Sequence, residues 1–242
     1  MNDVLQQLTA RKSVRVFTEE PVAPEVKAAV LRAATQAPSA GNQQLYTILD
    51  ITDPALKARL ADSCDHQPFI ATAPLVLIFC ADCAKWYDAF AATGCTPRKP
   101  GVGDLLLAVS DTNIAAQNAV TAAHSLGLGS CYIGDIMENC ELHREMLGLP
   151  PYVFPAAMLV LGYPTEQQLQ REKPERVDMA HIVHENGYRA MPPEELRAMW
   201  EPRCGLRPYE EWMRAFCERK YNSDFSREMT RSVAQYLREY TK

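Results

Sequence analysis

The segment RKSVRVF, residues 11–17, places positive charge and a hydroxyl close together near the start of an acidic chain. Arginine can donate two parallel hydrogen bonds to phosphate oxygens, and a serine hydroxyl can donate another. Arg11, Lys12, Ser13 and Arg15 could therefore bind a small anion. A basic run of this kind is also typical of a solvated surface, so the segment alone leaves both interpretations open.

Three later segments also combine small or polar residues with the boundary of a predicted helix or strand: APSAGNQ (37–43), GLGSCYIGD (127–135) and REKPERVD (171–178). Serine and asparagine favour exposed turns, and glycine allows a backbone to approach a ligand closely. The glycines of the second segment do not form GxGxxG between a strand and a helix, which argues against a Rossmann dinucleotide site. Each segment alone could be an ordinary loop, cap or charged surface, but their recurrence indicates a binding site.

The order of these four segments resembles that in the nitroreductase family of FMN-dependent oxidoreductases. The resemblance rests on RKSVRVF, PSAGNQQLY, the glycine-bearing segment after a long helix, and LGYP followed by KPER, and it covers roughly residues 8–188. It implies an α+β sandwich in which helices flank a central, mostly antiparallel sheet, and a homodimer with FMN at the interface. It further implies an enzyme that takes hydride from NAD(P)H onto flavin N5 and passes it to a nitroaromatic, quinone or enone. That mechanism would be ping-pong, with the chemistry supplied by the flavin and not by a catalytic side chain.

The same resemblance assigns residues to the FMN phosphate. Arg11, Ser13 and Arg176 would hold it, with further contacts from Lys12 and Lys173. Family members have K-P-R where this chain has KPER. The sequence therefore leaves open whether Lys173 or Arg176 is the main phosphate ligand.

Around the flavin ring, the resemblance implies contacts from both subunits. Arg15 would reach the ribityl chain or the pyrimidine edge, where a cation raises the reduction potential, and Gln67 would bond the same edge. The remaining ring contacts would be the backbone of Ile133 and Gly134 near N5 and O4, with Pro38, Ser39 and Asn42 of the partner subunit over the isoalloxazine.

Hydrophobic patterns predict the elements that carry these segments. Helices are predicted over 3–9, 24–37, 53–64, 104–126 and 138–147, and strands over 45–51, 75–81, 130–133 and 154–163. The continuous apolar run of 75–81 is typical of a strand covered on both faces. The helix over 104–126 is apolar around most of its circumference, which indicates burial in the core or in a subunit interface. We expect an FMN-binding domain over 1–190 and a helical extension over 191–242, packed on that core or on the partner subunit.

Composition and charge indicate which classes of partner the protein does not bind and which cellular compartment it occupies. The net charge is −5, and no segment is basic enough for general binding to nucleic acid or to an anionic membrane. The N-terminus lacks a basic region followed by an apolar one, so we expect no signal peptide. The longest predicted helix contains Asp111 and other polar residues, which argues against a membrane span. Eight cysteines without a secretion signal indicate reduced thiols, and hence a cytoplasmic protein.

The cysteines also support a competing class of function, a non-catalytic flavin-binding sensor or a Cys-based redox or metal-binding protein. Cys80 and Cys83 form C-x-x-C between a predicted strand and helix, which is the placement of a thioredoxin-like pair. A metal site would need a set without recognisable spacing, Cys80, Cys83 and Cys95 with Cys204 or Cys217. The aromatic pair Trp86 and Tyr87 could line a substrate entrance or pack in the core.

Overall fold

The computed structural model describes residues 2–241, which divide into two compact units. The first unit runs up to Glu172 and resumes at Glu228, and the second is Lys173–Arg227. The sequence predicts a boundary near residue 190, so the observed division falls earlier in the chain. The residues from Glu228 onward belong to the first unit as well.

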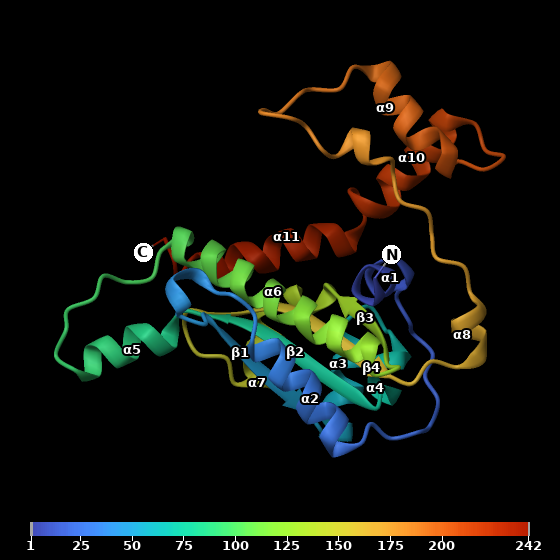
Figure 1. Ribbon diagram of the computed structural model, residues 1–242. Helices are drawn as coiled ribbons and strands as arrows, with labels where there is room; N and C mark the ends of the chain where they lie inside the picture. The colour runs from blue at the N-terminus through green and yellow to red at the C-terminus, as the bar shows by residue number, and fades with distance from the viewer. Residues whose placement is uncertain (1, 242) are drawn as a thin grey trace. The chain divides into compact units, whose positions relative to one another are not determined.

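A single sheet of four antiparallel strands forms the centre of the first unit, in the order β1–β2–β4–β3 (Figure 1). The strands are β1 (Tyr46–Ile51), β2 (Leu75–Asp82), β3 (Gly129–Ile133) and β4 (Val153–Gly162). Every residue of the two central strands, β2 and β4, is buried, as the continuous apolar runs predict. The predicted α+β class with an antiparallel sheet is confirmed.

Five helices of the first unit match predicted ranges to within two residues at either end, and the short helices over 68–72 and 166–170 are not among the predictions. The helices are α1 (Asp3–Ala10), α2 (Pro24–Thr35), α3 (Pro54–Ser63), α4 (Pro68–Thr72), α5 (Ala84–Ala92), α6 (Val102–Ser125), α7 (Cys140–Leu147) and α8 (Glu166–Gln170). Proline begins three of them, because its missing N–H has no intrahelical partner at that position. α7 starts two residues later than predicted, since Asn139 has a left-handed φ of 49°.

The second unit contains α9 (Pro193–Trp200) and α10 (Tyr209–Lys220), and α11 (Asp224–Leu237) begins there and continues into the first unit. Four single 3₁₀ turns complete the described chain: η1 (Ala40–Asn42), η2 (Asp135–Met137), η3 (Met179–His181) and η4 (Glu201–Arg203). Tyr236 of α11 is fully buried, with its ring edge-on to Phe154 of β4 at 5.1 Å between centroids. The end of the chain is therefore part of the core.

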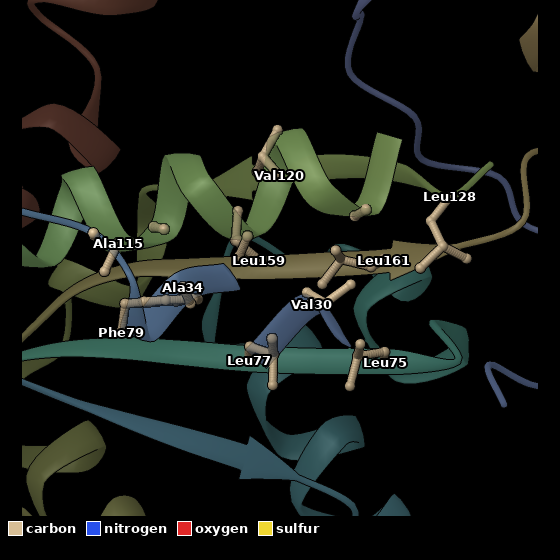
Figure 2. Close-up of a cluster of buried hydrophobic side chains, with 14 of the residues drawn as sticks. Val30, Ala34, Leu75, Leu77, Phe79, Ala115, Val120, Leu128, Leu159 and Leu161 are labelled. Atoms are coloured by element: carbon tan, nitrogen blue, oxygen red, sulfur yellow. The ribbon is translucent and has the colours of Figure 1, made fainter. Parts of the chain in front are cut away.

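Alternate residues of β2 enter two different cores. Leu75, Leu77 and Phe79 face α2 and α6, whereas Val76 and Ile78 face the opposite side with residues of α3 and α4. Figure 2 shows the first of these clusters, in which Val30, Ala34 and Ala115 lie beside the strands. Alanine on the buried face of α6 allows the helix to lie close to the sheet.

The longest helix, α6, buries only part of its apolar surface. Its alanine face is in the core, but Leu106, Leu107 and Ile114 are 62%, 51% and 41% exposed. The helix ends at Ser125, and Gly127 follows with a φ of +81°, which glycine adopts without strain. Within residues 2–241, α6 and all other helices fall short of the length and apolar character that crossing a membrane requires.

Candidate functional site

The segment RKSVRVF lies along the free edge of β3. The Val14 N–H donates to the Ser130 carbonyl at 2.9 Å, and Ser13 pairs with Ser130 as an isolated parallel bridge. A Cβ at Gly129 would stand 2.7 Å from the Val14 side chain, so the close approach requires glycine there. These contacts fix the first basic segment against the strand that leads to Gly134.

Arg11 and Arg15 carry charges that no acidic side chain neutralises within the described chain. Arg11 donates from Nη2 to the Ser130 hydroxyl at 3.4 Å and lies over the Tyr132 ring at 5.8 Å. Its Nε is buried without a hydrogen-bond partner, and the ion pairs of residues 2–241 include neither arginine. A buried donor without a partner is costly. An anion that accepts from Arg11 would remove that cost.

The charges of Arg15 and Arg11 converge on β3. Burial raises the pKa of the Cys131 thiol, and Arg15, the Ser13 hydroxyl and Arg11 oppose that rise. Burial also raises the pKa of Tyr132 to about 12, again opposed by Arg11. The side chains expected at the phosphate and ribityl groups, Arg11, Ser13 and Arg15, therefore all act on Cys131 of β3.

Lys12 has a different task from its neighbours in this arrangement. Its Nζ donates to the Leu169 carbonyl at 2.7 Å and also to the Arg171 carbonyl. Arg171 returns a bond to the Ser13 carbonyl, and Gln168 Oε1 accepts from the Arg15 N–H at 3.4 Å. α8 and Arg171, which follow β4, thus fasten the basic segment. The sequence does not predict these contacts, because the partners are more than 150 positions apart.

Gly134 follows directly after β3 and is exposed, whereas the Ile133 side chain is 2% exposed and faces the core. Gly134 has an ordinary φ of −80°, so glycine is not required there by backbone strain. Its carbonyl accepts from the Met137 N–H at 3.0 Å, which closes η2. The absence of a side chain at Gly134 leaves the backbone open at the end of the strand.

Gln67 lies in the connection between α3 and α4, directly before Pro68. Asp65 and His66 have left-handed φ values of +59° and +49°, which turn the chain so that Gln67 Nε2 donates to the Cys64 carbonyl at 2.8 Å. Burial, followed by the charge of Asp135, raises the pKa of Cys64 to about 12. Asp135 belongs to η2, so the segment that carries Gln67 is a neighbour of the turn at Gly134.

The loop with Pro38, Ser39 and Asn42 is organised by a buried carboxylate. Asp111 of α6 is 3% exposed and accepts from the N–H groups of Ala40 at 2.9 Å and Leu45 at 3.3 Å. Three residues in and beside η1, Gly41, Asn42 and Gln44, have φ values of +55°, +57° and +52°. Sequence reasoning noted Asp111 only as a polar residue in an apolar helix. An aspartate in an apolar, alanine-rich helix is the sequence signal that could have indicated a buried carboxylate with hydrogen-bond partners.

This loop and the Arg11 segment contact different stretches of α6. Arg11 lines a small cavity with His124 and helps burial to lower the pKa of that histidine. His124 is thirteen residues beyond Asp111, which is about 20 Å along a helix. In Figure 1 the loop after α2 reaches the end of α6 nearest α5, and α1 lies by the other end. Within one chain, the loop and Arg11 therefore contact different stretches of α6.

A cavity of about 410 Å³ adjoins the same loop. Trp86 donates from Nε1 to the Gln43 carbonyl at 2.8 Å, and its ring lies 5.5 Å from that of Phe90. Arg98 and Leu107 line the cavity from the following loop and from α6. Trp86 and Tyr87 therefore face a concave space and are not core residues.

Lys173 and Arg176 belong to the second unit. Arg176 lines a cavity of about 250 Å³ together with His181 and Arg203, and its Nη1 donates to the Pro174 carbonyl at 3.5 Å. Arg203 donates to the Glu175 carbonyl at 3.4 Å. Contact of Lys173 and Arg176 with an FMN phosphate stays a prediction.

The C-x-x-C pair of the competing class is buried. Cys80 and Cys83 are buried free thiols, and burial raises the pKa of both to about 12. A thiol with so high a pKa is a poor nucleophile at neutral pH. Across residues 2–241, no three His, Cys, Asp or Glu side chains come together as a metal site.

Comparison with known proteins gives one consistent result. The model of the nitroreductase family matches residues 8–163. An FMN reductase (NAD(P)H) of Bacillus subtilis (strain 168) is 32% identical over 238 residues, covering 98% of this chain and 91% of that protein. An oxygen-insensitive NADPH nitroreductase of Salmonella typhimurium is 36% identical over 202 residues, covering 83% and 80%. The structure of the NADPH:FMN oxidoreductase of Vibrio harveyi complexed with NAD+ has a TM-score of 0.77 and 26% identity, covering 99% of this chain and 98% of that one.

Proposed function

The chain belongs to the nitroreductase family and is an NAD(P)H-dependent oxidoreductase with FMN as its cofactor, and we propose that it is a homodimer that reduces small planar acceptors by a ping-pong mechanism. The acceptor class comprises nitroaromatics, quinones and enones. The observation that carries the proposal is that Arg11 and Arg15, which have no carboxylate partner within the described chain, flank Ser13 in a segment held against β3.

The residues of the basic segment beside β3 fit the phosphate end of FMN. Arg11 offers a buried donor without a partner, and Ser13 offers a hydroxyl next to it. Lys12 would contribute through its backbone, because its ammonium is already bonded to two carbonyls. Arg176 and Lys173 of the second unit would add positive charge. Together these groups would hold a dianionic phosphate by charge-assisted hydrogen bonds.

At the ring, the protein would supply shape and charge. Bound FMN provides the redox chemistry, accepting two electrons and a proton from NAD(P)H and delivering them to the acceptor. Arg15 and Gln67 would favour negative charge at the pyrimidine edge. The open backbone at Gly134 would leave room for a planar molecule over the ring, so nicotinamide and acceptor would use the same place in turn.

A homodimer is proposed because, within one chain, the loop contacts α6 at Asp111, whereas the Arg11 segment lies beside a later stretch of that helix. The loop with Pro38, Ser39 and Asn42 would cover a flavin bound to the Arg11 segment of the other copy. The exposed apolar residues of α6, Leu106 and Ile114, supply surface for such an interface. The cavity at Trp86 adjoins this loop, so its aromatic wall would stack on the planar acceptor.

The test begins with the purified protein. We expect a yellow protein with a flavin absorption spectrum that NADH or NADPH bleaches under anaerobic conditions, and rapid reoxidation by a quinone or a nitroaromatic. A colourless protein that does not take up added FMN would contradict the proposal. Bound flavin that neither nucleotide reduces would favour the competing function, a flavin-binding sensor.

A further inference from the structure

A buried histidine makes two hydrogen bonds immediately behind the candidate flavin site. The His143 side chain, on α7, is completely buried. Its Nε2 lies 2.8 Å from the Ser63 Oγ, and its Nδ1 lies 3.0 Å from the Ile136 carbonyl oxygen. A carbonyl only accepts, so Nδ1 carries the proton and Nε2 accepts from the Ser63 hydroxyl. Burial lowers the pKa of His143, which agrees with a neutral ring in this tautomer.

The two partners of His143 belong to the two segments that approach the flavin ring from different elements. Ser63 is the last residue of α3 and precedes the turn that orients Gln67. Ile136 lies in η2, which begins one residue after Gly134. The side chain of Asn139 makes a parallel link, donating to the Ser63 carbonyl at 3.0 Å. A single imidazole ring therefore spans the space between the Gln67 segment and the Gly134 turn.

Packing alone does not explain a histidine at this position. A buried polar ring contributes less than an apolar side chain of similar size unless its hydrogen bonds are needed. Both ring nitrogens of His143 are satisfied, and each bond reaches a different segment. The ring therefore acts as a spacer of fixed length and direction.

We propose that His143 is a positioning residue for the flavin site, because it sets the distance between the segment that carries Gln67 and the turn that carries Gly134. This inference rests on the proposed function, in which both segments contact the isoalloxazine. His143 itself touches no cofactor atom. Its effect on bound FMN passes through Ser63 on one side and Ile136 on the other.

Two substitutions break the same link from its two ends. Ser63→Ala removes the hydroxyl and leaves the bond from His143 to Ile136 in place. His143→Asn keeps an amide nitrogen near the position of Nδ1, so it preserves the bond to Ile136 and loses the one to Ser63. The matched control is Thr112→Val, which removes a buried hydroxyl that donates to the Ala108 carbonyl at 2.6 Å within α6.

The measurements are the dissociation constant of FMN for the deflavinated protein, the visible circular dichroism of the flavin at saturation, and the melting temperature. We expect FMN to bind about 3- to 10-fold more weakly to Ser63→Ala and His143→Asn. The visible dichroism should change in both, and Thr112→Val should match the wild type in affinity and dichroism. The double variant should bind FMN no more weakly than the weaker-binding single variant, because both substitutions remove the same Ser63–His143 hydrogen bond.

Wild-type affinity and dichroism in Ser63→Ala would overturn the inference, and so would equal losses in Ser63→Ala and Thr112→Val. Additive losses in the double variant would also overturn it, since the two residues would then act separately. If His143→Asn does not fold, Ser63→Ala and its control still decide the question. Failure of the wild type to bind FMN would instead contradict the proposed function.

Discussion

Two groups of arginines in the first unit have opposite surroundings. Between α7 and α11, Arg144 forms two bonds to Glu239 at 2.5 and 2.6 Å, and Arg231 pairs with both Glu141 and Glu228. On the edge of β3, Arg11 and Arg15 have no carboxylate partner within the described chain. Charge that the fold neutralises stabilises the fold, and charge that it leaves free is available to a ligand. Arg144 and Arg231 therefore stabilise the fold through their carboxylate partners, whereas Arg11 and Arg15 are the arginines that we propose to bind FMN.

The largest expected effect on stability is at the buried pair. Arg144→Ala would leave Glu239 partly buried without its cation and would remove the guanidinium from the Tyr236 ring, 4.9 Å away. We expect a loss of about 2–3 kcal/mol of unfolding free energy, measured by urea denaturation. FMN affinity of the folded variant should stay within about twofold of the wild type. If Arg144→Ala kept its stability but lost flavin, Arg144 would be a binding residue and not a structural one.

Substitution of Arg11 should weaken FMN binding and leave the stability of the fold almost unchanged. Arg11→Ala removes the donor whose Nε lacks a partner, so we expect FMN to bind about 10- to 100-fold more weakly with little change in melting temperature. Fluorescence titration measures the affinity. Arg189→Ala is the control, since Arg189 is exposed and paired with Glu195. Equal affinity in the two variants would contradict the assignment of Arg11.

Glu138 is an exception within the paired region and gives a pH-dependent prediction. It is 6% exposed, its Oε1 has no partner, and burial followed by repulsion from nearby carboxylates raises its pKa to about 7. The folded state therefore keeps a proton that the unfolded state releases. Unfolding free energy should fall as pH rises from the ordinary value near 4.5 through about 7.

Glu138→Gln removes this titration and keeps the shape of the side chain. We expect the variant to lose less stability than the wild type between pH 6 and pH 8. Each kcal/mol corresponds to about 2–4 °C in melting temperature for a domain of this size, so thermal scans at the two pH values resolve the difference. Parallel pH profiles in the two proteins would show that Glu138 is ionised when folded.

The smallest effect is expected at the exposed end of the paired region. Arg231 bonds to Glu141 and Glu228 at 2.8 Å, but these side chains are largely solvated, and such pairs contribute little. Arg231→Ala should lower the melting temperature by less than about 2 °C at neutral pH. Arg231 holds the pKa of Glu141 down to about 2, so its contribution should fade as pH falls from 4.5 toward that value. A large loss at pH 7 would mean that exposure does not weaken the network.

Local patterns were sufficient to predict the frame of the fold. The apolar run at 75–81 predicts a strand buried on both faces, and the spacing of residues in 104–126 predicts the long helix. Both depend on short-range periodicity, which a single sequence displays. The late start of α7 could not be read in the same way, because Asn139 adopts a left-handed conformation that its neighbours do not indicate.

The residue types of the candidate site could be proposed from the sequence, but the tertiary contacts that hold them could not. Arg11 and Ser13 stand out by charge and spacing, and Gly134 by its place after a predicted strand. Asp111 and His143 gave no comparable signal, since each acts on backbone groups far away in the sequence. The basic run also does not reveal that the Lys12 ammonium donates to the Leu169 carbonyl. Tertiary partners decide these roles.

The seating of Val14 on Gly129 also bears on the order of folding. The bond from Arg11 to Ser130 joins residues 119 positions apart, and closing so long a loop is slow and gains nothing until the pairing is complete. A chain emerging from the ribosome would have to extend past β3 before its first basic segment has a strand to join. Cofactor capture would then be a late event, restricted to chains that have already completed the sheet.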